Sequence, residues 1–255
     1  MTAIVGIFCK DGIVIGADSA ATSAAAGGIR TVEQPVMKIH IIDDRIIIAG
    51  SGQVGLSQRF RAQVGDLWAN KRLVGADRFA WTQTVAAAAI KNFHETAVQQ
   101  DQFGALVAFP CKHEHHLVEF ASRDFQPEFK DGNIWYVSMG SGQLIVDPFL
   151  AFIRDVFWNG GPPTTQDAIF ATTWALDHVI SVNPGGVNGP VHVATLERIK
   201  SDWRARLLSD DDLLEHRANI GAAKDALRSY KERMTEGAEA AEIPQAPDSS
   251  IPARQ

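Results

Sequence analysis

The sequence predicts an α+β protein in which antiparallel sheets are layered against helices. Strand patterns and helix patterns come in separate groups: four strands, two helices, three or four strands, two helices and one strand. The first strands are apolar on both faces, so at least one sheet is expected to be covered on both sides. With 45% hydrophobic and 21% charged residues among 255, the chain has enough apolar content for a full core.

The N-terminal segment predicts a β-hairpin. Residues 2–8 (TAIVGIF) and 13–18 (IVIGAD) are apolar runs that flank the turn Lys10-Asp11-Gly12, and Asp-Gly between such runs is a strong hairpin signal. Residues 19–28 are small and rich in Gly and Ala, so we expect a loop there.

A second hairpin and two helices are expected next. The β-branched runs 37–42 and 45–50 flank Asp43-Asp44. Apolar residues then recur at helical intervals in 53–70 and in 78–99, and an alanine run favours a helix in the second segment.

The middle and end of the chain repeat the alternation. Strands are expected at 104–109, 116–121 and 133–137, then helices at 147–158 and 166–182, and a closing strand at 190–197. We therefore expect a domain over residues 1–199, a helical extension over 200–236 and a disordered tail over 237–255, which is rich in Pro, Ala, Glu and Ser.

Composition excludes several classes of protein. The net charge of −6 argues against nucleic-acid binding as the main function. Two cysteines are too few for a disulfide scaffold and indicate a reducing compartment. No apolar run reaches the roughly 18 residues of a membrane span, and no signal-peptide pattern is present. We expect a cytoplasmic protein without membrane or nucleic-acid partners.

Several short motifs stand in the order and spacing of one known family. They are Thr2 after Met1, Gly6, Lys10-Asp11-Gly12, Gly16-Ala17-Asp18, Ala21-Thr22-Ser23, Lys38, Ile48-Ala49-Gly50 and Met139-Gly140-Ser141-Gly142. Over about residues 2–199 the chain resembles a proteasome β-type subunit. The resemblance implies the N-terminal nucleophile hydrolase fold, a four-layer αββα sandwich of two antiparallel sheets between helix layers. Among the bacterial branches (HslV, Anbu and the β-proteasome homologue) the last is favoured.

The resemblance makes Thr2 the nucleophile. A threonine hydroxyl needs a nearby base, and the α-amino group that removal of Met1 exposes has a pKa of about 7.7–8.0, near working pH. Thr2 directly after Met1 implies that no propeptide is present. The alternative is a surface threonine that begins a strand.

Other site residues follow from the same motifs. Lys38 and Asp18 are expected to activate Thr2, or else to form an ordinary ion pair. Gly50 is expected to donate its backbone N–H to the oxyanion, or to be a turn glycine. Ser141 is expected to orient the N-terminal amine, or to cap a helix.

The chain departs from the family pattern after the fourth helix. An aspartate and a following serine are expected there, but the segment reads Val182-Asn183-Pro184-Gly185. Asn183 takes the aspartate's place without its negative charge, which leaves the tuning of the amine in question.

The resemblance also places substrate-binding residues at Ala21 and Ile48. Ile48 corresponds to the floor of the main substrate pocket and shares a strand face with Gly50. Because isoleucine is bulky and uncharged, we expect Ala, Val or Leu to be preferred before the cleaved bond.

A compact group of metal-binding residue types lies at 111–116 (CKHEHH). Cys111, His113, His115 and His116 are of the types that bind zinc, but a polar exposed hairpin turn is favoured, so no metal is expected. A nucleotide-binding loop is also absent from the sequence, and no cofactor is expected.

Together these observations predict an N-terminal threonine peptidase subunit of a self-compartmentalising ring complex. The expected partners are copies of the same chain in a double ring of hexamers or heptamers, unfolded proteins or peptides as substrates, and a separate ATPase unfoldase. Two alternatives stay open: an assembling shell subunit with little or no peptidase activity, and a small-molecule amidase of the same class.

Overall fold

The computed structural model describes residues 2–24, 30–98, 102–158, 160–182 and 186–235. The described strands form two antiparallel five-stranded sheets and a separate hairpin. The first sheet has the order β10 (Tyr136–Met139), β1 (Ile4–Phe8), β2 (Gly12–Ala17), β11 (His192–Ile199) and β12 (Asp202–Leu207). The second has the order β5 (Ile39–Ile42), β6 (Ile46–Gly52), β7 (Phe103–Cys111), β8 (Glu114–Phe120) and β9 (Pro127–Lys130).

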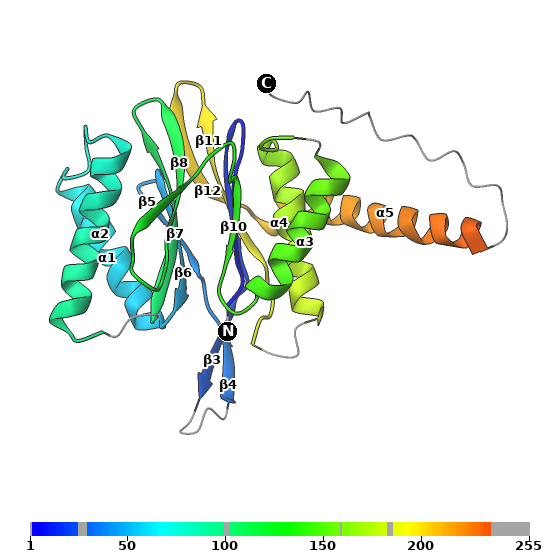
Figure 1. Ribbon diagram of the computed structural model, residues 1–255, viewed down its shortest axis with the longest axis horizontal. Coiled ribbons are helices and arrows are strands. Elements are labelled where there is room, and N and C mark those ends of the chain that lie inside the picture. Colours follow the sequence, from blue (N-terminus) through cyan, green and yellow to red (C-terminus); the bar gives the residue numbers. More distant parts are fainter. Residues whose placement is uncertain (1, 25–29, 99–101, 159, 183–185, 236–255) are drawn as a thin grey trace, which may run out of the picture. The chain divides into compact units, whose positions relative to one another are not determined.

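Helix pairs cover the outer faces of the two sheets, as Figure 1 shows. Helices α1 (Val54–Ala69) and α2 (Arg78–Glu95) contact the second sheet, and α3 (Gln143–Phe157) and α4 (Thr165–Val182) contact the first. The expected four-layer αββα sandwich is therefore confirmed.

One apolar cluster fills the space between the sheets. It joins Ile4, Ile13 and Ile15 of the first sheet to Ile47 and Leu106 of the second, all of them fully buried. These strands are apolar on both faces because their other faces meet helices. Burial of each such side chain stabilises the fold by about 1.5–3 kcal/mol.

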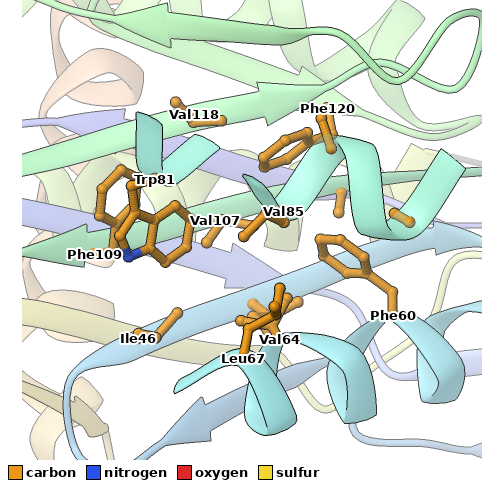
Figure 2. Packing of buried hydrophobic residues seen from close by; sticks show 14 of the residues in the cluster. Ile46, Phe60, Val64, Leu67, Trp81, Val85, Val107, Phe109, Val118 and Phe120 are labelled. Carbon is orange, nitrogen blue, oxygen red and sulfur yellow. The ribbon is translucent and has the colours of Figure 1, made fainter. Parts of the chain in front are cut away.

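A second cluster lies between the second sheet and helices α1 and α2 (Figure 2). Phe60 of α1 and Trp81 of α2 are 0% and 1% exposed. The Trp81 ring stacks on Phe109 of β7 with centroids 3.8 Å apart. The helical spacing of the apolar residues predicted these two helices correctly.

Helix α4 lies very close to strand β2. A Cβ added to Gly16 would be 2.3 Å from Cγ2 of Thr172 and 2.8 Å from Cδ1 of Leu176. Only a glycine leaves room for this approach, which explains the glycine directly after the β-branched residues Ile13, Val14 and Ile15.

The expected loop at 19–28 is wrong in its described part. Residues 20–24 form β3 (Ala20–Ala24), which pairs with β4 (Arg30–Pro35) in a hairpin. The small residues of β3 have low strand propensity, and the pairing with β4 overrides it.

Two edge strands were also not predicted. Strand β9 begins at Pro127, which an edge strand tolerates at its first residue. Strand β12 follows β11, where the helical extension was expected to begin, so residues 190–197 do not close the sheet. In β12 the buried Trp203 and Ala205 alternate with the arginines at 204 and 206, a period of two that the charges conceal.

The chain divides into two compact units, Met1–Arg217 and Ala218–Gln255. Helix α5 (Asp210–Thr235) begins in the first unit and continues into the second. The predicted disordered tail at 237–255 lies outside the described residues. No helix in the described part of the chain is long and apolar enough to cross a membrane.

Candidate active site

The start of β1 and the end of β2 bring Thr2 and Asp18 to one edge of the first sheet. Ile4 pairs with Ala17, and the backbone N–H of Ala3 donates to Oδ1 of Asp18 at 2.8 Å. Asp18 is fully buried, whereas Thr2 is 8% exposed. The hairpin therefore fixes the position of Thr2 through the residue that follows it.

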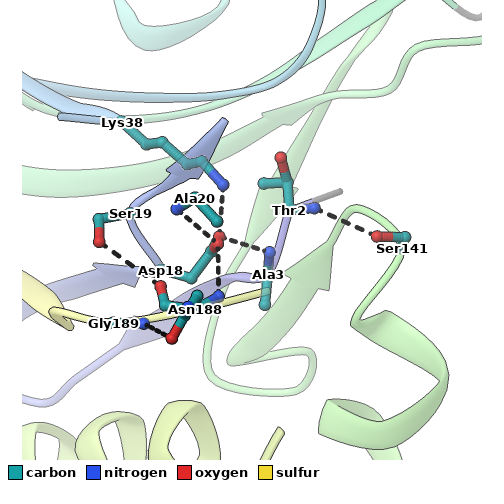
Figure 3. A network of polar contacts seen from close by, with 9 residues as sticks. All are labelled: Thr2, Ala3, Asp18, Ser19, Ala20, Lys38, Ser141, Asn188 and Gly189. Carbon is teal, nitrogen blue, oxygen red and sulfur yellow. Dashed lines mark hydrogen bonds and ion pairs between the residues drawn. The ribbon is translucent and has the colours of Figure 1, made fainter. Parts of the chain in front are cut away.

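Asp18 is also the counterion of Lys38 (Figure 3). Nζ of Lys38 donates to Oδ1 at 2.6 Å, and the backbone N–H groups of Ala20 and Asn188 donate to Oδ2 at 3.1 and 3.4 Å. Burial lowers the pKa of Lys38, and the Asp18 carboxylate opposes that shift. Lys38 is thus a buried cation that gives up its proton more readily than a surface lysine.

The Met-Gly-Ser-Gly segment holds the backbone of Thr2. The Thr2 N–H donates to Oγ of Ser141 at 3.1 Å, and the N–H of Gly142 donates to the Thr2 carbonyl at 3.0 Å. Gly140 has φ +90°, and a Cβ there would lie 2.3 Å from the Thr2 carbonyl oxygen. Both the backbone conformation and the close approach require glycine at this position.

A cavity of about 520 Å³ opens beside Thr2. It is bounded by the base of the β3–β4 hairpin, the end of β6 and the first turns of α1, and its lining includes the following residues: Thr2, Ala21, Lys38, His40, Gly50, Ser51, Val54, Ser57, Gln58, Arg61 and Ser141. Five of the predicted site residues therefore line one cavity, and the buried Asp18 contacts the wall through Lys38.

Gly50 lies where β6 extends beyond its neighbour β5. The pairing of these strands ends at Ile39 and Ala49, whereas β6 continues to Gly52. A Cβ on Gly50 would be 2.7 Å from Oγ of Ser57. The absence of a side chain keeps the cavity open beside Ser57.

Ile48 does not lie where we expected it. Its side chain is 1% exposed and belongs to the apolar cluster beneath α1 and α2, and it is absent from the cavity lining in the described part of the chain. Strand alternation does put it on the Gly50 face, but α1 covers that face at position 48. Asn183 lies outside the described residues.

Sequence reasoning missed the contribution of α1 and of His40. Val54, Ser57, Gln58 and Arg61 are spaced at i, i+3, i+4 and i+7, so they form one stripe of the helix, and all four line the cavity. That spacing was readable, but the polar stripe has the pattern of an ordinary solvated face.

The predicted exposed turn at 111–116 is correct only in part. Lys112 and His113 form an exposed turn between β7 and β8, whereas Cys111 and His116 are buried. Nε2 of His115 donates a hydrogen bond to the Cys9 carbonyl (2.9 Å), and the ring stacks on Phe8. His116 is 6% exposed, and burial lowers its pKa to about 4. Strand alternation in β8 turns these two rings into the protein on opposite faces. Across the described residues, no three His, Cys, Asp or Glu side chains are grouped to hold a metal.

Comparison with known proteins identifies relatives of the N-terminal half. The family model described as "Proteasome subunit" matches residues 2–122. "Proteasome subunit beta 2" of Pyrococcus furiosus is 46% identical over 54 residues, 21% of this chain and 24% of the relative. "Proteasome subunit beta 1" of Thermococcus sibiricus is 36% identical over 83 residues, 28% of this chain and 38% of the relative. The chain thus spans less than two fifths of these curated relatives.

Solved structures resemble the whole sandwich. An Anbu Gly-1 mutant from Hyphomicrobium sp. strain MC1 has a TM-score of 0.70 and 15% identity, over 92% of this chain and all of that one. The Anbu complex from Pseudomonas aeruginosa, described as a helical assembly, has a TM-score of 0.67 and 15% identity, over 97% of this chain and 99% of that one. At these identities the likeness is one of fold.

Proposed function

Since this chain belongs to the proteasome β-type subunit family, we propose that it is an N-terminal threonine peptidase subunit of a self-assembling, proteasome-like complex. One observation carries the proposal: Thr2, Lys38 and Ser141 line the same cavity, with Asp18 buried behind Lys38. A buried lysine that shares a cavity with a hydroxyl at the start of the first strand favours activation of that hydroxyl.

The chemistry begins with removal of Met1, which turns the Thr2 amide nitrogen into a free α-amine. This nitrogen is 3.1 Å from Oγ of Ser141, which orients it. The amine takes the proton of the Thr2 hydroxyl while the Lys38 ammonium stabilises the oxygen that attacks the scissile carbonyl. The Gly50 N–H is proposed as the donor to the oxyanion.

Collapse of that intermediate breaks the peptide C–N bond. The α-ammonium returns its proton to the departing amine, and the acyl group stays on Thr2 as an ester. Water, deprotonated by the same α-amine, then attacks the ester and releases the second product.

A shell subunit without peptidase activity is the second candidate function. The observation that favours it is Asn183, which stands where the family pattern has a charged aspartate. A neutral amide would leave the α-amine less well tuned as a base. An amidase acting on small molecules is the weaker alternative.

The proposal also covers the assembly, the substrates, the partner and the location of this protein. We expect copies of this chain to form a double ring of six or seven subunits each, and native mass spectrometry tests this against the helical assembly described for the P. aeruginosa Anbu complex. Unfolded proteins or peptides are the proposed substrates, a separate ATPase unfoldase is the proposed partner, and the cytoplasm is the proposed location.

The function is tested by intact-mass measurement and covalent labelling of the full chain. Loss of Met1 and labelling of Thr2 by a peptide epoxyketone are expected, and Thr2→Ala is expected to abolish labelling and peptide hydrolysis. Thr84→Ala on α2 truncates the same side chain outside the cavity and should retain both. Retained Met1 with no labelling would favour the shell subunit, and full hydrolysis by Thr2→Ala would exclude Thr2 as the nucleophile.

A further inference from the structure

The charged side chains that line the cavity beside Thr2 in the described part of the chain all have the same sign. The described lining of this cavity contains two cationic side chains, Lys38 and Arg61, and no aspartate or glutamate. The two cations differ in their surroundings, because Lys38 is paired with the buried Asp18 at 2.6 Å. The guanidinium of Arg61 instead meets Nδ1 of His40 at 3.0 Å. Among the residues of this lining that the structure describes, the end formed by Arg61 and His40 therefore carries positive charge and no carboxylate.

The fold places these two residues precisely. Arg61 is the last member of the α1 stripe that begins at Val54, and His40 lies in β5, two residues beyond Lys38. Lys38, His40 and Arg61 all line the one cavity, so the Arg61–His40 end belongs to the same cavity as the lysine and the nucleophile.

The hydrogen bond also fixes the protonation of His40. A guanidinium only donates, so Nδ1 must accept and the ring proton resides on Nε2. Burial and the positive charge of Arg61 lower the pKa of His40, which keeps the ring neutral. The imidazole Nε2–H and the remaining guanidinium N–H groups are then donors, and a carboxylate is the ligand that accepts from both.

We propose that Arg61 and His40 make this cavity selective for an acidic side chain on the residue that precedes the cleaved bond. That the acidic residue precedes a cleaved bond rests on the proposed function. Recognition of its carboxylate by Arg61 and His40 does not. It replaces the apolar preference expected from Ile48, whose side chain is buried in the cluster under α1.

Binding tests the proposal separately from turnover. Fluorescein-labelled Ala-Ala-Ala-Glu-Ala and its Gln and Leu counterparts are titrated against the Thr2→Ala protein, which does not consume them. The Glu peptide is expected to bind about tenfold more tightly than the Gln peptide, as for a charge-assisted hydrogen bond. The difference should shrink in 1 M salt, because Arg61 is exposed.

Charge reversal supplies the sharper comparison. In the same background Arg61→Gln is expected to remove the preference for Glu, and Arg61→Glu to transfer it to a Lys peptide. Lys91→Gln on α2 removes another exposed positive charge, which lies outside the cavity, and should change nothing. Equal affinity for the Glu and Gln peptides, including no measurable binding of either at 1 mM, would overturn the proposal. Selective binding by a protein that neither cleaves nor labels would uphold it and reject the peptidase function instead.

Discussion

Replacement of Asp18 by asparagine is expected to be among the most damaging conservative changes in this protein. Oδ1 accepts from the Ala3 N–H and from Lys38, and Oδ2 accepts from the N–H groups of Ala20 and Asn188. An asparagine amide has one acceptor oxygen, so its NH₂ group would face two donors whichever way it turns. It would also remove the carboxylate charge 2.6 Å from the buried Lys38 ammonium.

The size of the effect follows from burial. The Asp18 side chain is 0% exposed and that of Lys38 is 8% exposed, and removal of one partner of a buried ion pair costs about 3–5 kcal/mol. The matched control is Asp202→Asn, since Asp202 pairs with Arg45 at 2.6 Å but the two side chains are 38% and 31% exposed. An exposed pair of this kind contributes at most about 1 kcal/mol.

Urea denaturation followed by tryptophan fluorescence measures the free energy of unfolding of both variants. The double variant Asp18→Asn with Lys38→Met should be more stable than Asp18→Asn alone, because it removes the buried ammonium that has lost the charge of Asp18. If Asp18→Asn yields no folded protein, recovery of folding by the double variant also shows that the Lys38 ammonium destabilises the Asp18→Asn protein. Equal losses for Asp18→Asn and Asp202→Asn, or no gain from Lys38→Met, would refute the reasoning.

Two further predictions concern the Gly140 turn and the buried histidine. Gly140→Ala should lower the free energy of unfolding by about 1–3 kcal/mol, because alanine is strained at φ +90° and its Cβ collides with the Thr2 carbonyl. Epoxyketone labelling of Thr2 should slow at least about tenfold. The control Gly132→Ala, which has open space around it, should leave stability and labelling unchanged. His116 has a pKa of about 4 in the folded protein against an ordinary value of 6.5, so the unfolded chain binds more protons between these values and stability is lost as pH falls from about 6.5 to about 4. The loss of stability should approach about 3 kcal/mol. His116→Phe, which would pack beside Phe109 and Phe129, should flatten the dependence of the denaturation midpoint on pH. The same pH dependence in His116→Phe and the parent protein would contradict the lowered pKa of His116.

Much of the fold was predictable because its elements carry local signals. The Asp-Gly turn and the two apolar runs around it set the β1–β2 hairpin, and the spacing around Phe60 and Trp81 set α1 and α2. The glycines of the Met-Gly-Ser-Gly segment were recognisable as a motif, although their contact with Thr2 became visible only in three dimensions. Strands β3 and β12 were not predictable from composition, because each is held by pairing with another strand rather than by its own propensity.

The sequence alone determined the alternation of strands and helices, the hairpin that ends in Asp18, and the presence of a threonine, a lysine and a glycine motif in a recognisable order. Tertiary structure decided which of these residues share a cavity and what surrounds them. Burial lowers the pKa of Lys38, α1 covers Ile48, and Arg61 meets His40 across 21 positions of the chain. Such properties depend on desolvation and on contacts between distant segments, which no local pattern of residues encodes.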